Sequence, residues 1–95
     1  MDISKSDVVI STAGRDKDRW FYVLEAEENF VLIADGKHRK IENPKRKKLK
    51  HVRKVTRTES EIAEKIQRGD MILNSELRRD LAARSQQFNS QNQGG

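Results

Sequence analysis

Apolar residues form three short runs in the first third of the chain, and each run has the composition of a β-strand. The first, Asp7 to Thr12, is rich in β-branched residues and is followed by Gly14 and a polar segment. The second, Trp20 to Ala26, has apolar side chains at odd and even positions, which predicts a strand covered on both faces or closed into a barrel. Three polar residues separate it from the third run, Phe30 to Ala34, so these two runs predict a β-hairpin.

Two further strands are predicted after Asp35-Gly36, a pair typical of a type I′ hairpin turn. One spans Lys37 to Glu42 and is exposed. The other spans Leu49 to Thr56, where apolar residues alternate irregularly, so we expect a bulge or an edge position. Five short strands joined by tight turns predict a mainly β fold with C-terminal helices, built on a small, partly open SH3-like barrel.

A helical pattern replaces the strand pattern at Thr58. Thr58 as N-cap and Glu61 have the spacing of a capping box, apolar residues follow at helical intervals, and Gly69 is a C-terminal stop. A second short helix is predicted from Ser75 to Arg84, capped by Asn74 or Ser75. The apolar residues of these helices have no partner of their own, so we expect the helices to pack on the barrel or on each other.

The remaining segments complete the domain organisation. Met71 to Leu73 link the two helices and, being apolar, are expected to pack against the barrel. Residues 85–95 are rich in Gln and Asn without periodicity, which predicts a disordered tail. The chain thus divides into a barrel over residues 1–57, a helical extension over 58–84 and the tail.

Size and composition limit the classes of function. A chain of 95 residues, 37% of them charged and 34% hydrophobic, has room for one small core and no separate catalytic domain. It has no cysteine, no phosphate-cradling glycine loop and no histidine beside a Ser/Asp pair, so we expect neither an enzyme nor a bound metal or cofactor. The N-terminus lacks the apolar run of a signal peptide and no segment approaches a membrane span, which predicts a cytoplasmic protein. We expect a monomer when the protein is free.

Positive charge is concentrated in one part of the chain. From Lys37 to Arg57, eleven Lys or Arg residues stand against one acid, Glu42, whereas the remainder has nine bases and fourteen acids. The formal net charge of +5 therefore comes from this stretch. A basic cluster of this density indicates contact with a polyanion such as nucleic acid, the alternative being a solvated surface.

Pro44, within this basic stretch, is expected to hold Lys45 to Lys48 in a stiff projecting loop, with none of these four side chains in the core. Lys and Arg neutralise phosphates, while Arg, His and Asn side chains can also bond to or stack on a base. The aromatic residues from Trp20 to Tyr22 and Phe30 lie in apolar runs, where core packing is expected, so structured RNA is favoured over single strands. The candidate RNA contacts are Arg15, Lys17, Lys37, His38, Arg39, Lys40, Asn43, Lys45, Arg46, Lys47, Lys48, Lys50, His51 and Arg53.

Several of these segments together resemble a known motif. Asp7 to Asp16, a hydrophobic strand and then Asn29 to Ile33 look like a KOW motif, which opens the SH3-like barrel of several ribosomal proteins and transcription elongation factors. The continuation, Asp35 to Lys37 with Asn43 to Val52, is similar to bacterial KOW-domain RNA-binding proteins related to an archaeal and eukaryotic large-subunit ribosomal protein.

The resemblance covers the predicted barrel and not the helices. It implies an SH3-like barrel that binds ribosomal or other structured RNA, with Gly14 as the glycine of the motif and Val8 and Ile10 facing the core. This chain departs from the family at Asp16 and Asp18, which put acids into a loop where such modules carry mainly bases. We therefore do not expect this loop to be the chief contact.

Charge and resemblance together predict an RNA-binding protein of the translation apparatus, with ribosomal RNA as its partner and ribosomal proteins as further partners. The alternative from another class is a protein-interaction module that docks on the ribosome or the transcription machinery, with the basic face only steering association. Exposure of the apolar linker Met71 to Leu73 would favour that alternative.

Overall fold

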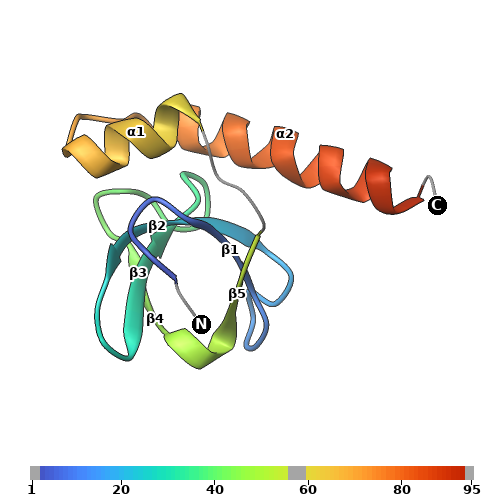
Figure 1. Ribbon diagram of the computed structural model, residues 1–95, viewed down its shortest axis with the longest axis horizontal. Coiled ribbons are helices and arrows are strands. Elements are labelled where there is room, and N and C mark those ends of the chain that lie inside the picture. Colours follow the sequence, from blue (N-terminus) through green and yellow to red (C-terminus); the bar gives the residue numbers. More distant parts are fainter. Residues whose placement is uncertain (1–2, 56–59, 94–95) are drawn as a thin grey trace.

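The computed structural model describes residues 3–55 and 60–93 and shows a five-stranded antiparallel sheet with two C-terminal helices packed on one face (Figure 1). The elements are β1 (Val8–Ser11), β2 (Trp20–Ala26), β3 (Phe30–Ala34), β4 (Lys45–Lys48), the 3-10 turn η1 (Leu49–His51), β5 (Val52–Lys54), α1 (Glu61–Arg68) and α2 (Asn74–Gln93). The strand order is β4-β3-β2-β1-β5, so β4 and β5 lie at opposite edges of the sheet. Because η1 connects these two edges directly, the sheet curls until its edges approach each other at that end.

The first three predicted strands are confirmed. β1 falls within Asp7 to Thr12, and β2 and β3 have the predicted bounds and pair as a hairpin. A register shift between Val23 and Glu25 places the β-bulge in β2, not in the last strand. That last strand is shorter than predicted, since Leu49 to His51 form η1, and it pairs with β1 at the sheet edge.

The segment after β3 differs from its prediction. Lys37 to Glu42 forms turns and no strand, and the expected projecting loop Lys45 to Lys48 is itself strand β4, paired with β3. A type I′ turn needs a positive φ at both central residues. Gly36 has a φ of 78°, but the φ of Asp35 is not positive, so the turn is of another type. The Asp35 carboxylate instead accepts backbone hydrogen bonds from N–H groups two and four residues later, at 2.9 and 2.8 Å. These local bonds compete with a sheet ladder, which explains the missing strand.

The sheet buries an apolar cluster on each face, as the two-sided pattern of β2 predicts. The cluster inside the curl consists of Val9, Phe21, Val23, Val31, Ile33 and Val52. The helix-side cluster consists of Val8, Tyr22, Ala34, Ala63, Ile66, Leu77 and Leu81. The prediction that the helices pack on the strands is therefore confirmed. Val8 and Ile10 are both buried, as the resemblance implies.

The first helix begins later than predicted. Its N-cap is Ser60, whose Oγ accepts a hydrogen bond from the backbone N–H of Ala63 at 3.0 Å. The predicted N-cap, Thr58, lies outside the described residues. Gly69 ends the helix in the left-handed conformation, as predicted, with a φ of 78°.

The second helix is longer than predicted. It runs to Gln93, so the predicted disordered tail is wrong for residues 85–93. Phe88 lies seven residues after Leu81, and its ring packs edge-on against Trp20 with 5.4 Å between ring centroids. It therefore extends the apolar stripe of the helix by two turns, which explains why the polar composition of the segment is misleading.

A buried tyrosine joins the sheet to both helices. The Tyr22 hydroxyl donates to Asp80 Oδ2 at 2.5 Å and lies 3.1 Å from Ser60 Oγ. Burial raises the pKa of Tyr22 to about 12, and the hydrogen bond to the Asp80 carboxylate acts in the same direction. The hydroxyl thus keeps its proton at neutral pH and remains a donor that connects β2 with α2.

A substitution at Gly36 tests the contact between the loop after β3 and α2. A methyl group there would overlap the backbone carbonyl oxygen of Asn74 and lie 3.1 Å from the backbone nitrogen of Arg78, at a φ of +78°. Gly36→Ala is expected to lower the free energy of unfolding by about 2 to 5 kcal/mol, through left-handed strain and overpacking. Gly69→Ala is the matched control, because Gly69 has the same φ and no atom within 4 Å of the added methyl. It should cost only about 1 to 2 kcal/mol in urea unfolding. Equal losses would contradict the packing of α2 on this loop.

Candidate nucleic-acid interface

A buried ion pair fixes the β1–β2 loop to the edge strand β4. The Asp16 carboxylate, whose side chain is 6% exposed, lies 2.5 Å from Lys47 Nζ and 2.8 Å from Lys45 Nζ. It also accepts a hydrogen bond from Ser11 Oγ at 2.7 Å, and Lys47 donates to the Ala13 carbonyl at 2.6 Å. Two segments 31 residues apart in the chain thus form one continuous surface.

The ion pair keeps its charges at neutral pH. Burial by itself raises the pKa of Asp16, but the hydrogen bonds from Lys45, Lys47 and Ser11 outweigh burial and hold the pKa well below its usual value. A buried carboxylate with two ammonium partners is satisfied, whereas either charge alone would be costly to bury.

This arrangement corrects the prediction for Lys45 to Lys48. Lys47 is 7% exposed, so the expectation that none of the four side chains lies in the core is wrong. The reason is that successive side chains of a strand point to opposite faces. Lys45 and Lys47 therefore reach Asp16, while Arg46 and Lys48 face solvent.

The β1–β2 loop, the loop after β3 and α2 enclose two adjoining hollows. One, of about 260 Å³, includes Arg15, Arg39 and Lys45. The other, of about 300 Å³, shares Arg19 and His38 with it and adds acids Asp18 and Asp35. We call the two together the basic groove, after its bases Arg15, Arg19, Lys37, His38, Arg39, Lys45 and Arg78.

The Asp35 carboxylate contacts groups of its own loop, residues 35–39. Burial alone raises the pKa of Asp35, but hydrogen bonds from the backbone N–H groups of Arg39 and Lys37 outweigh it and lower that pKa. His38 Nδ1 lies 3.2 Å from the same carboxylate. The carboxylate therefore shapes the loop, and the side chains of Lys37 and His38 remain exposed.

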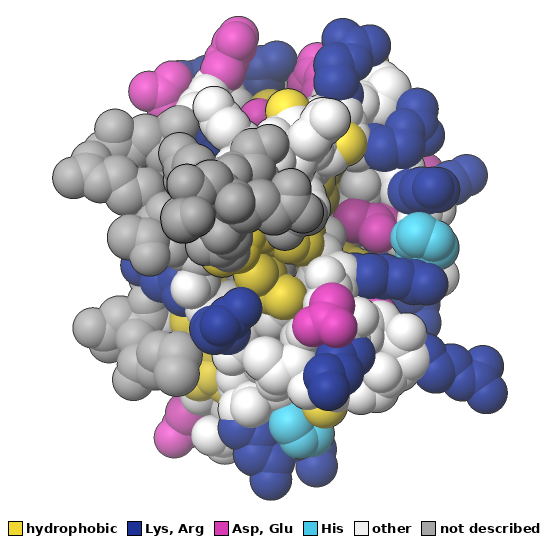
Figure 2. Space-filling view, turned by 90° about the vertical axis from the view of Figure 1, so that its right-hand side faces the viewer, with side chains coloured by type: hydrophobic (Ala, Val, Ile, Leu, Met, Phe, Trp, Pro, Cys, Tyr) yellow, Lys and Arg dark blue, Asp and Glu magenta, His cyan; other side chains and the backbone are white. Residues whose placement is uncertain are grey.

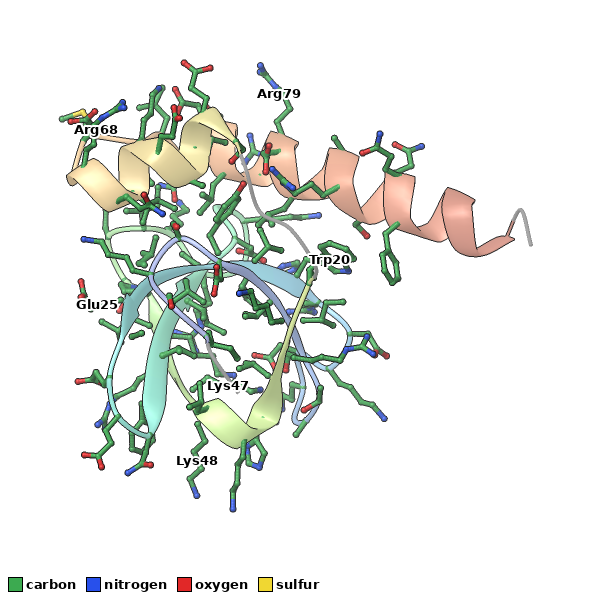
Figure 3. All side chains as sticks on the ribbon, in the orientation of Figure 1. Trp20, Glu25, Lys47, Lys48, Arg68 and Arg79 are labelled. Atoms are coloured by element: carbon green, nitrogen blue, oxygen red, sulfur yellow. The ribbon has the colours of Figure 1, made fainter. Side chains whose placement is uncertain are left out.

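A second basic region lies at the end of the sheet farthest from the helices. Lys48 points away from the molecule there (Figure 3). Lys50, two residues later in the chain, is also exposed. A hollow of about 580 Å³ opens at this end, which we call the η1 groove. Its lining residues are Asn29, Phe30, Lys48, Leu49 and Lys50.

Most of the predicted RNA contacts lie at the surface. The exposed ones are Arg15, Lys17, Lys37, His38, Lys40, Asn43, Arg46, Lys48, Lys50 and Arg53, the half-buried ones are Arg39, Lys45 and His51, and Lys47 is buried. The residues that line neither groove are Lys17, Lys40, Asn43, Arg46, Lys47, His51 and Arg53. Figure 2 shows Lys and Arg gathered along the right-hand side and lower edge of one face, with both histidines among them.

The predicted RNA contacts do not include Arg19, Arg78, Asn29 and Phe30, which line these grooves. Arg19 belongs to the loop whose acids argued against it as the chief contact, yet one of those acids, Asp16, is bound by lysines. Arg78 lies in the acidic remainder of the chain, and only the packing of α2 brings it to the groove. Asn29 was overlooked, and Phe30 was expected in the core. The alternation of β3, with Val31 and Ile33 inside the curl, already puts Phe30 on the other face.

Neither a scan against protein-family models nor a search of curated proteins finds a match to the chain. Across residues 3–55 and 60–93, no helix is long and apolar enough to cross a membrane. Within that same part of the chain, no three His, Asp or Glu side chains lie together as metal ligands would. The charge and shape of the two grooves are therefore the features of this structure that indicate a function.

Asp16→Asn tests the ion pair, because it leaves Lys47 buried without a counter-charge. We expect the free energy of unfolding at neutral pH to fall by about 3 to 5 kcal/mol. Asp18→Asn is the matched control, since Asp18 is an exposed acid of the same loop with a φ of 74°, which Asn tolerates. It should change stability by less than about 0.5 kcal/mol. A wild-type melting curve for Asp16→Asn would contradict the structural role of the pair.

The ion pair also predicts a pH dependence. The pKa of Asp16 is lower in the folded chain than in the unfolded chain, where it is about 3.9. Its stabilisation is present above that value and is lost as the pH falls through the folded pKa. The stability difference between wild type and Asp16→Asn should therefore shrink between about pH 5 and about pH 2. A difference that stays constant over this range would contradict the account.

Proposed function

We propose that the protein binds structured RNA through the basic groove and the η1 groove. The observation that carries the proposal is a separation of charge around these grooves. Asp16 binds two lysines, Asp35 caps its own loop, and Glu42 accepts a hydrogen bond from Asn74 Nδ2 at 2.6 Å. Most of the nearby bases remain exposed beside one exposed acid of the groove, Asp18, and phosphates are the natural counterions for these bases.

The extent of the surface favours a polymer over a small anion. Its bases come from the β1–β2 loop, the loop after β3, α2 and η1, so they reach from the helix side to the opposite end of the sheet (Figure 1). A single phosphate would need only one of these sites. Arginines of the basic groove can bond phosphate oxygens in pairs, while the lysines act as point charges.

We also propose that the sheet is an SH3-like barrel of the KOW kind. Five antiparallel strands and a three-residue 3-10 turn joining the two edge strands support this proposal. The resemblance of the N-terminal half to KOW-domain proteins supports it independently, and it favours ribosomal RNA as the partner.

A second candidate function is supported by the linker between the helices. Met71 is 85% and Leu73 56% exposed, so the expected packing is wrong for these two residues. Ile72 alone of the three packs against the helix-side cluster. Two exposed apolar side chains two residues apart in the chain favour a protein-interaction module that docks on a larger assembly.

RNA binding predicts a steep salt dependence. With five to eight phosphate contacts, log affinity for a hairpin RNA should fall against log salt with a slope of about −4 to −7. Removing Arg15 and Arg19 together as alanines should flatten this slope by about two units. Fluorescence anisotropy over a salt series measures both quantities. A wild-type slope near zero would overturn the proposal.

The matched control removes the same charge from the other side of the molecule. Arg68 and Arg79 lie on the helices and point away from the sheet (Figure 3). The double variant Arg68→Ala with Arg79→Ala should keep the wild-type slope. Equal flattening in both double variants would show that net charge, and no particular surface, governs binding.

The two candidate functions separate in cell extracts. If RNA contact holds the protein on ribosomes, Arg15→Ala with Arg19→Ala should reduce co-sedimentation, and Met71→Ser with Leu73→Ser should not. All four residues are exposed, so both variants are expected to melt as the wild type does. The reverse pattern of co-sedimentation would make the interaction module the better account.

A further inference from the structure

The η1 groove differs in chemistry from the basic groove. Its volume of about 580 Å³ falls within the range of small-ligand sites, which is about 300 to 1,000 Å³. Phe30 and Leu49 line it with apolar surface, and the exposed residues Lys48 and Lys50 line it as well. Apolar surface beside two cations fits a ligand with a flat apolar part and negative charge next to it.

Phe30 belongs to neither core cluster, but other contacts hold its ring in place at the surface. The Arg46 guanidinium lies 3.8 Å from the centroid of its ring, and Glu27 Oε1 lies 3.2 Å from Arg46 Nε. Arg46 does not line the η1 groove, so the groove opens on another side of the ring. The aromatic ring is therefore fixed before any ligand arrives, which lowers the entropy cost of stacking on it.

Asn29 supplies a polar group beside the ring. Its backbone carbonyl accepts a hydrogen bond from the backbone N–H of Leu49 at 2.9 Å, which fixes this end of the β2–β3 loop against η1. Its side chain is exposed and lines the groove. An amide side chain both donates and accepts, so it can bond to the edge of a nucleobase.

We propose that the η1 groove binds one unpaired nucleotide of a structured RNA. The base stacks on Phe30 and packs against Leu49, the Asn29 amide bonds its edge, and Lys48 and Lys50 contact the flanking phosphates. Bases inside a duplex are stacked and cannot enter such a groove, whereas a bulged base can. This inference rests on the proposed function and deepens it, because it names the feature of the RNA that the protein recognises.

The test uses the full chain and two hairpin RNAs that differ only in one bulged 2-aminopurine. Stacking quenches the fluorescence of this base, so binding in the groove should quench it. The bulged hairpin should also bind about tenfold more tightly than the fully paired one, as expected for one base–aromatic stack. Phe30→Leu should remove both effects, so that the two hairpins bind with equal affinity.

Two further variants guard against loss of fold. Phe30→Tyr keeps an aromatic ring and should retain the quenching and the preference for the bulge. Phe88→Leu removes the partly exposed aromatic side chain of α2 and should behave as the wild type does.

The outcomes separate this inference from the proposed function. Equal affinity for both hairpins, or quenching that persists in Phe30→Leu, overturns the nucleotide site and leaves RNA binding intact. Absence of binding to either hairpin at physiological salt overturns both.

Discussion

The contact of Asp16 with Lys47 and Lys45 is the interaction on which the candidate surface depends. Burying the charges of Asp16 and Lys47 is tolerable only because the carboxylate meets both ammonium groups and also accepts a hydrogen bond from Ser11. The contact joins the loop that carries Arg15 and Arg19 to the strand at the edge of the sheet. It also neutralises one acid of the basic groove, which leaves Asp18 as an exposed acid beside the bases there.

Helix α2, which lies outside the basic stretch of the sequence, holds the loop after β3 in place beside the basic groove. Asn74, at the start of α2, accepts a hydrogen bond from the backbone N–H of Ile41 at 2.8 Å and donates to Glu42. Gly36 allows the α2 backbone to approach the same loop closely. The loop that carries Lys37, His38 and Arg39 is thus held between the sheet and a helix. The helices therefore stabilise the domain and also position its bases.

Local patterns predicted the elements whose causes are local. The sequence predicted β1, β2 and β3 and the glycine that ends α1. Strands and helix ends can be predicted in this way because their sequence signals lie within a few residues of each other. β4 was missed because four consecutive bases carry no apolar alternation. It forms a strand because β3 offers a partner and because Asp16, 31 residues away from Lys47, neutralises the inward charge. No pattern around Lys47 contains that information.

The candidate site was predictable to the same extent. The density of Lys and Arg in the sequence predicted most of the exposed bases, because a solvated side chain can be predicted without knowing what packs around it. The sequence did not predict the role of Arg78, because its position depends on where α2 packs. It did not predict the η1 groove, because this groove depends on how the β2–β3 loop meets η1. The predicted tail failed for a related reason, since a single aromatic residue, Phe88, docks an otherwise polar segment on Trp20.

In the proposed complex, RNA lies across the basic groove and the η1 groove. The most direct test is a titration of the isotope-labelled chain with a bulged hairpin RNA, followed through backbone amide chemical shifts. We expect the largest changes in residues 15–19, 37–40 and 48–50, with the amides of Arg68 and Arg79 unaffected. Changes confined to the outer face of the helices, or to the linker at residues 71–73, would contradict it.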